Sequence, residues 1–247
     1  MAPQDTATVA ARPGPFGLDL SHAAVIVVDM QNDFGSAGGM FDRAGIDIAP
    51  IRAVVEPIVR VVGAARQAGI PIVYLKMGFR SDLSDLGPDH ATNRQRHLFM
   101  GVGEPVEAPD GTHSRVLVRD TWNTDIVDEL TPAPEDHVIY KHRFSGFFQT
   151  GLEGLLRSQA VRDIIFTGCT TSICVESTLR DAMFRDFRCL LLEDCTAEPI
   201  GAAADRTNHE ASLLAIETLF GWVAPSTALL HELTAAAPAD LRHAATV

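Results

Sequence analysis

Three residues whose side chains can carry out chemistry together lie far apart in the sequence: Asp29, Lys141 and Cys174. Asp29 follows the wholly apolar run 23–28, and Lys141 ends the shorter run 137–141. A thiol can attack a carbonyl carbon, a carboxylate can accept and return its proton, and an ammonium group can stabilise the thiolate. The three residue types therefore favour nucleophilic catalysis at a carbonyl group, provided that the fold brings them together.

Cys174 follows a turn rich in Thr and Ser, residues 170–173, which leads from an apolar run into a helical pattern. Free N–H groups at a helix N-terminus lower the pKa of a thiol and can also stabilise an oxyanion. We therefore expect a reactive thiolate at this position.

Each of the three residues, considered alone, also has a purely structural interpretation. Cys174 could be a small buried side chain that packs under a helix. Asp29 could be a base, a metal ligand or the N-cap of the next segment, and Lys141 could be a strand-end side chain pointing into water.

The elements that position these side chains are predicted to be strands of a parallel sheet. Continuous apolar runs without alternation indicate strands that are buried on both faces. Such runs cover residues 23–29, 70–75, 163–168 and 189–193, with 137–141 as a shorter candidate. Helical patterns lie between them, at 51–68, 152–159, 175–186 and 206–219. Strands that alternate with helices predict a single-domain, three-layer α/β/α fold with a mainly parallel central sheet.

In such sheets, ligands bind beyond the C-terminal ends of the strands. Asp29 and Lys141 each end a predicted strand, and Gly168 leads out of another toward Cys174. The sequence therefore predicts that all three side chains lie at the same edge of the sheet.

The domain is expected to cover residues 21–233. Residues 1–20 are rich in Ala, Pro and Gly and are expected to form a flexible arm, and residues 234–247 form an Ala-rich tail. Residues 78–124 are irregular and polar, and an insertion of this length is more often a lid or binding loop than packing.

Composition excludes several classes of partner. The net charge of −12 over 247 residues repels phosphate backbones and anionic membranes, so nucleic acid and membrane partners are not expected. No apolar run approaches the roughly 20 residues that span a bilayer, and residues 1–20 lack the pattern of a signal peptide. We expect a cytoplasmic protein, in which the four cysteines stay reduced.

The segments around the three residues resemble those of the isochorismatase-like cysteine hydrolases. The resemblance extends over roughly residues 20–230 and depends on three motifs in the family's order: 28–34, 141–148 and 167–181. It implies that Asp29, Lys141 and Cys174 are the catalytic triad. It also implies a cis peptide before Thr170 and an oxyanion hole made by the N–H groups of Thr170 and Cys174.

Within this superfamily, the sequence is most similar to the ureidoacrylate amidohydrolases of pyrimidine breakdown, through residues 174–181 and 216–223. A second similarity is to biuret hydrolases, through residues 79–86 and 191–195. Both groups cleave carbamoyl groups. The resemblance therefore implies an amidohydrolase that cleaves the C–N bond of a small ureide through a thioester and releases ammonia. Biuret or triuret, N-carbamoyl amino acids and a more apolar primary amide are alternative substrates, and a non-catalytic scaffold is an alternative of another class.

The sequence also departs from these relatives. Leu219 stands where biuret hydrolases carry a substrate-binding Gln. The side chains expected to line the pocket are Phe34, Met40, Met77, Phe79, Asn93 and Phe144. Because most of them are apolar, we expect a substrate less polar than ureidoacrylate.

Two further activities of the superfamily are not expected. True isochorismatases lack the catalytic cysteine, and the Asp/His cluster that holds a metal in nicotinamidases is not evident after Leu75. We therefore expect neither a metal nor a cofactor. As family members often are, the protein is expected to be a homodimer or homotetramer.

Overall fold

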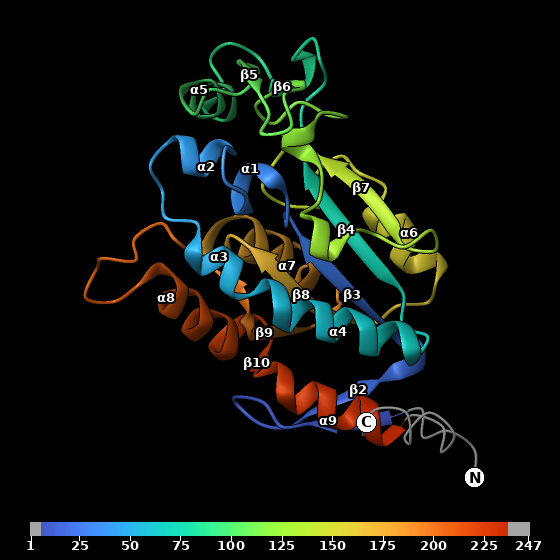
Figure 1. The fold of residues 1–247 in the computed structure, drawn as a ribbon. Helices are drawn as coiled ribbons and strands as arrows, with labels where there is room; N and C mark the ends of the chain where they lie inside the picture. Colours follow the sequence, from blue (N-terminus) through green and yellow to red (C-terminus); the bar gives the residue numbers. More distant parts are fainter. Residues whose placement is uncertain (1–5, 237–247) are drawn as a thin grey trace.

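The computed structural model describes residues 6–236, which form three layers around a six-stranded sheet (Figure 1). The strand order is β10-β9-β8-β3-β4-β7, and every neighbouring pair is parallel. The strands are β3 (Ala23–Val28), β4 (Ile72–Met77), β7 (His137–Lys141), β8 (Asp163–Cys169), β9 (Arg188–Ala197) and β10 (Trp222–Ala224). The predicted three-layer α/β fold is confirmed, and β10 is an additional edge strand.

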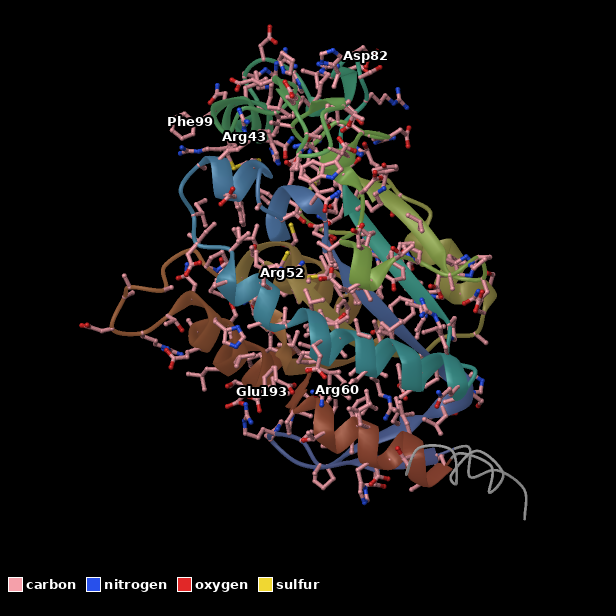
Figure 2. The ribbon with its side chains drawn as sticks, viewed as in Figure 1. Arg43, Arg52, Arg60, Asp82, Phe99 and Glu193 are labelled. Atoms are coloured by element: carbon pink, nitrogen blue, oxygen red, sulfur yellow. The ribbon has the colours of Figure 1, made fainter. Side chains whose placement is uncertain are left out.

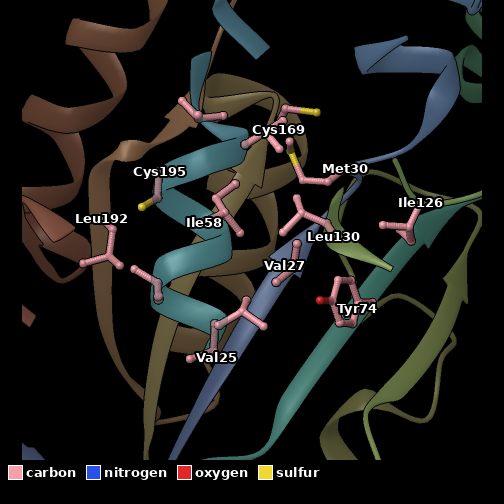
Figure 3. Close-up of a cluster of buried hydrophobic side chains, with 14 of the residues drawn as sticks. Val25, Val27, Met30, Ile58, Tyr74, Ile126, Leu130, Cys169, Leu192 and Cys195 are labelled. Carbon is pink, nitrogen blue, oxygen red and sulfur yellow. The ribbon is translucent and has the colours of Figure 1, made fainter. Parts of the chain in front are cut away.

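Successive side chains of the central strand β3 enter two separate hydrophobic clusters. Val25 and Val27 face one cluster, and Ile26 and Val28 face the other. Fully burying a side chain of this size contributes roughly 1.5–3 kcal/mol, so both faces stabilise the fold. Figure 3 shows Ile58 packed near Val25 and Val27 in the first cluster.

Helices cover both faces of the sheet. The first face is covered by α3 (Ala49–Ala53), α4 (Val55–Gln67) and α9 (Ser226–Ala236). The second face is covered by α6 (Leu152–Ser158) and α7 (Glu176–Met183). The remaining helices are α1 (Asn32–Gly35), α2 (Met40–Arg43), α5 (Thr92–Phe99) and α8 (Asn208–Ala215). Short 3₁₀ turns cover Leu20–His22, Ser84–Leu86, Trp122–Thr124 and Asp128–Leu130.

Local sequence signals account for several helix ends. Gly69, with φ +74°, follows α4, where a left-handed residue closes the last turn. Thr207 caps α8 because its side chain accepts from the N–H of Glu210, whose carboxylate accepts from Thr207 in return. The helix predicted over 51–68 is divided at Val54 into α3 and α4.

The prediction of a flexible arm over residues 1–20 is wrong for residues 6–19. This segment forms an antiparallel pair, β1 (Thr6–Val9) with β2 (Phe16–Asp19). Its alternate side chains are buried in the first cluster, and β1 contacts α9. The Ala-, Pro- and Gly-rich composition concealed this short alternating pattern. Residues 1–5 lie outside the described residues, as does the predicted Ala-rich tail beyond Ala236, where α9 ends.

The predicted insertion, residues 78–124, leaves the C-terminal end of β4 and stands at one end of the molecule (Figure 1). It contains α5 and a small antiparallel pair, β5 (Pro105–Glu107) with β6 (His113–Arg115). The buried carboxylate of Asp33 connects it to the core, because it accepts from the N–H of Leu117 (2.7 Å) and of Met40 (2.9 Å). Phe99, 86% exposed, lies at the outer edge of the insertion beside Arg43 (Figure 2). That the insertion acts as a lid stays a prediction.

Among residues 6–236, no helix has both the length and the apolar character needed to cross a bilayer.

Candidate active site

The structure brings the three predicted catalytic side chains together at the C-terminal edge of the sheet. Lys141 Nζ lies 2.7 Å from Asp29 Oδ2, and the two side chains are 0% and 1% exposed. The thiol of Cys174 lies close enough to both groups for each of them to shift its pKa. A thiol, a carboxylate and an ammonium group are therefore buried close to one another.

Backbone contacts between neighbouring strands hold Asp29 in place. Asp29 directly follows β3 and has a positive φ of 50°, and its N–H donates to the carbonyl of Leu75 at 2.9 Å. The thiol of Cys169 donates to the carbonyl of Asp29 at 3.1 Å. At Gly168, with φ +108°, a Cβ would lie 2.1 Å from Val28 O, so only glycine allows β8 to approach β3 this closely.

Burial and charge act in opposite directions on the buried ion pair. Burial raises the pKa of Asp29, although the nearby Lys141 opposes the shift. Burial lowers the pKa of Lys141, but its interactions with Asp29 and Cys174 outweigh this effect, and the pKa is raised overall. Because the two groups are in contact and no water separates them at 2.7 Å, we take the pair as ionised at neutral pH.

The expectation of a lowered pKa at Cys174 is wrong. Burial raises the pKa of this thiol, and the neighbouring carboxylate of Asp29 raises it further. Cys174 is 7% exposed and lies within a π-helical turn, Thr171–Val175, that precedes α7. The resting thiol is therefore protonated, and it needs a base before it can attack.

Asp29 is placed to be that base. Both of its carboxylate oxygens are buried, and neither is held by a hydrogen bond of good geometry within residues 6–236, the ion pair with Lys141 aside. A buried oxygen without a donor costs about 1–3 kcal/mol. Such an oxygen is ready to accept the proton of the thiol.

The predicted oxyanion-hole residues lie on the turn that carries the nucleophile. A cis peptide joins Cys169 to Thr170, where the resemblance implied one. The carbonyl of Thr170 accepts from the N–H groups of Ile173 and Val175, both at 3.2 Å, which closes the turn around Cys174. The role of the Thr170 and Cys174 N–H groups as an oxyanion hole stays a prediction.

Sequence reasoning missed Glu198, which holds the nucleophile's turn. Its Oε2 accepts from the backbone N–H of Ser172 (3.0 Å) and from the Ser172 hydroxyl (2.5 Å). The side chain is only 5% exposed and directly follows β9. The strand predicted over 189–193 ended before Glu198, so no signal like the one that identified Asp29 was available.

Replacing Glu198 by Gln is expected to lower kcat by roughly 10- to 100-fold, because small displacements of a nucleophile are costly. KM should change little, since Glu198 acts through the turn rather than on the substrate. Steady-state kinetics measure kcat and KM of Glu198→Gln. The control is Glu135→Gln, a substitution at an exposed position. An unchanged kcat with a raised KM would show that Glu198 contacts substrate instead.

The residues predicted to bind substrate fall into two groups. Met77 contacts the triad, with its Sδ 3.6 Å from Lys141 Nζ, and Phe79 and Phe144 pack on the two sides of His97. Phe144 is 38% exposed.

The other three predicted substrate residues make structural contacts. Phe34 packs edge-on against Phe41, and Met40 donates its N–H to Asp33 within the first cluster. Asn93 uses its side-chain amide to bind the carbonyl of Leu86 at 3.0 Å. For all six residues, substrate binding stays a prediction.

Within the part of the chain that the structure describes, no three or more His, Cys, Asp and Glu side chains are grouped so that they could hold a metal ion. The expectation that the protein needs neither metal nor cofactor stays a prediction.

The chain is similar to known proteins over most of its length. The family model described as the isochorismatase domain matches residues 23–228. The ureidoacrylate amidohydrolase RutB of Cronobacter sakazakii is 40% identical over 219 residues, which are 89% of this chain and 91% of that protein. RutB of Klebsiella pneumoniae is 38% identical over 234 residues, which are 95% of this chain and 96% of that protein.

Two solved structures have the same fold over most of their length. A cysteine hydrolase from Pseudomonas syringae superposes with a TM-score of 0.74 and 28% identity, covering 89% of this chain and 95% of that one. An N-carbamoylsarcosine amidase from Thermoplasma acidophilum superposes with a TM-score of 0.58 and 26% identity, covering 83% and 96%.

Proposed function

Because this chain belongs to the isochorismatase family, we propose that it is a cysteine-dependent amidohydrolase that cleaves the C–N bond of a small ureide or carbamoyl compound. The observation that carries the proposal is the buried contact of Asp29 with Lys141, beside the buried thiol of Cys174, whose pKa both groups affect. A purely structural ion pair has no need of a thiol beside it.

In the first half of the reaction, Asp29 accepts the thiol proton of Cys174, and Lys141 stabilises the thiolate. The thiolate attacks the carbonyl carbon, and the oxyanion is held by the N–H groups of Thr170 and Cys174. Asp29 then donates its proton to the leaving nitrogen. The C–N bond breaks, ammonia departs, and the acyl group remains on Cys174 as a thioester.

In the second half, Asp29 removes a proton from water, and the resulting hydroxide attacks the thioester carbonyl. The C–S bond breaks, and the proton returns to the sulfur. From a ureide, the acid released is a carbamate, which loses carbon dioxide to give the free amine. The raised pKa of Asp29 supports this role, because a carboxylate held in a buried site is a stronger base than one in water.

The substrate class is supported by the relatives. Those of highest identity above are named ureidoacrylate amidohydrolases, and one structural neighbour is named for an N-carbamoyl substrate. Met77 contacts Lys141, and Phe144, three residues after Lys141, exposes part of its apolar ring. We therefore propose a ureide whose remaining group is less polar than that of ureidoacrylate.

Ammonia release from a panel of ureidoacrylate, biuret, N-carbamoyl amino acids and apolar primary amides tests the proposal. We expect release from ureides by the wild type and none by Cys174→Ala. The matched control is Cys189→Ala, which removes a buried thiol of β9 and should keep its activity. Release from apolar amides alone would keep the mechanism and change the substrate. If no compound of the panel released ammonia, the result would contradict the proposal and favour a scaffold protein.

The family resemblance also bears on the location and the oligomeric state of the protein. We propose that it works in the cytoplasm as a homodimer or homotetramer, as the family resemblance implies. Light scattering on the purified protein tests the oligomeric state, and a monomer at micromolar concentration would contradict it.

A further inference from the structure

His97 comes from the insertion and packs against Phe79 and Phe144, which lie in the segments that follow Met77 and Lys141. It belongs to α5 and is 1% exposed. Its ring packs at 4.9 Å from the ring of Phe79 and 5.4 Å from that of Phe144. Phe79 comes two residues after Met77, which contacts Lys141, and Phe144 comes three residues after Lys141 itself.

A single hydrogen bond fixes the tautomer of this ring. His97 Nδ1 lies 2.7 Å from the carbonyl oxygen of Asn93, one helical turn earlier. A carbonyl oxygen can only accept, so Nδ1 carries the proton and donates it. In a neutral ring the other nitrogen, Nε2, is then an acceptor, and within residues 6–236 it has no hydrogen-bond partner.

The surroundings keep the ring neutral. Burial lowers the pKa of His97, and the positive charges of Lys141 and Arg143 lower it further. His97 therefore offers a neutral acceptor in contact with two aromatic rings, in the part of the insertion that packs on the segments following Met77 and Lys141.

A ureide differs from a plain amide in one respect that such an acceptor can recognise. In a ureide, R–NH–CO–NH₂, an N–H group stands on the side of the carbonyl that keeps its bond when ammonia leaves. In a plain amide, R–CH₂–CO–NH₂, a methylene stands there and offers no proton. Lys141 and Arg143 are donors and cannot bind this N–H group.

We propose that Nε2 of His97 accepts a hydrogen bond from this substrate N–H and thereby selects ureides over plain amides. The inference rests on the proposed function and assigns to that site its specificity-determining residue. Phe79 and Phe144 hold the ring on both sides, and Asn93 acts through the ring by fixing its tautomer. This explains why Asn93, predicted from the sequence as a substrate residue, binds the protein instead.

The kinetic test compares a ureide with its methylene isostere in the wild type and in His97→Phe, which keeps an aromatic ring and removes the acceptor. We expect kcat/KM for the ureide to fall by about tenfold, the value of one hydrogen bond. The amide should change by less than about twofold, because it makes no such bond. His97→Gln, which offers an amide oxygen, should recover part of the preference. His113→Phe is the matched control, an exposed histidine of the same insertion.

Three results are distinguishable. If His97→Phe lowers kcat/KM equally for the ureide and the amide, His97 has a packing role. If it lowers kcat/KM for neither, His97 has no role in catalysis or binding. Either result overturns the inference. If no ligand of the panel is cleaved by the wild type, the proposed function itself fails. Where the amide binds without being cleaved, its inhibition constant against the ureide gives the same comparison.

A spectroscopic measurement tests the inference in a protein that keeps the His97 side chain. In Cys174→Ala labelled with ¹⁵N-histidine, the His97 signals are assigned by their loss in His97→Gln. We expect the Nδ1–H tautomer in the free protein and a shift of the Nε2 resonance with the ureide but not with the amide. An Nε2–H tautomer, or the same shift with both ligands, would contradict the inference.

Discussion

Replacing Asp29 by Asn is expected to lower kcat by about 10³-fold or more, since a positioned base contributes roughly 10²–10⁴ and the ion pair is lost as well. The variant also leaves the ammonium group of Lys141 buried without its carboxylate, which lies 2.7 Å away in the wild type. Breaking a buried pair in this way costs about 3–5 kcal/mol of the free energy of unfolding. Ammonia release and denaturant unfolding measure the two effects.

The reactivity of the Cys174 thiol distinguishes a role of Asp29 as a base from a purely structural role. Asp29 raises the pKa of Cys174, whereas Lys141 lowers it. In Asp29→Asn only the ammonium group remains, so the pKa of the thiol falls and the thiolate fraction at a given pH rises. Alkylation of Cys174 should therefore begin at a lower pH than in the wild type, although hydrolysis is lost. Slower alkylation at every pH would be inconsistent with this arrangement.

The double variant Asp29→Asn/Lys141→Met is the matched control for stability. It removes both charges, and replacing a whole buried pair is often neutral, whereas removing one partner is not. We expect it to unfold at a higher denaturant concentration than Asp29→Asn while remaining inactive. If it is no more stable, the loss in the single variant has another origin than the unpaired charge.

Gly168→Ala is expected to lower the free energy of unfolding by about 3–5 kcal/mol, because strain and overpacking add. The new Cβ would lie 2.1 Å from Val28 O and 2.6 Å from Val28 N, and the residue has a φ of +108°. Neither obstacle involves a flexible side chain, so strands β8 and β3 must separate. Since Asp29 follows β3 directly and Cys169 contacts it, activity should fall as well.

Gly63→Ala is the control, and its expected change in the free energy of unfolding has the opposite sign. Gly63 lies inside α4, its φ is not positive, and nothing lies within 4 Å of an added Cβ. Alanine favours a helix over glycine by about 1 kcal/mol, so this variant should be more stable than the wild type. Calorimetry of the two variants compares them. A Gly168→Ala protein as stable as Gly63→Ala would contradict the close approach of the two strands.

The sequence predicted the sheet and the triad for one physical reason. Strands buried on both faces are continuous apolar runs, and a charged residue at the end of such a run is conspicuous. Asp29 and Lys141 were found in this way, and the structure places them in contact. The strand β10 was missed, because an edge strand of three residues leaves no run to detect.

Residues whose partners lie far along the chain were harder to identify. Glu198 binds Ser172. His97 packs against Phe79, which follows β4, and against Phe144, which follows β7. Neither position is informative from the sequence until the strands are assembled. The lowered pKa predicted for Cys174 failed for a related reason. A helix N-terminus was evident in the sequence, but the burial and the facing carboxylate that outweigh it were not.

The β1–β2 pair has a consequence for how the protein is made. The N–H of Thr8 meets the carboxylate of Glu232, 224 residues later, and β1 packs on α9. During synthesis, the apolar side chains of β1 and β2 emerge before α9, on which β1 packs. A polypeptide interrupted before residue 226 thus presents an uncovered apolar surface, which chaperones and proteases recognise.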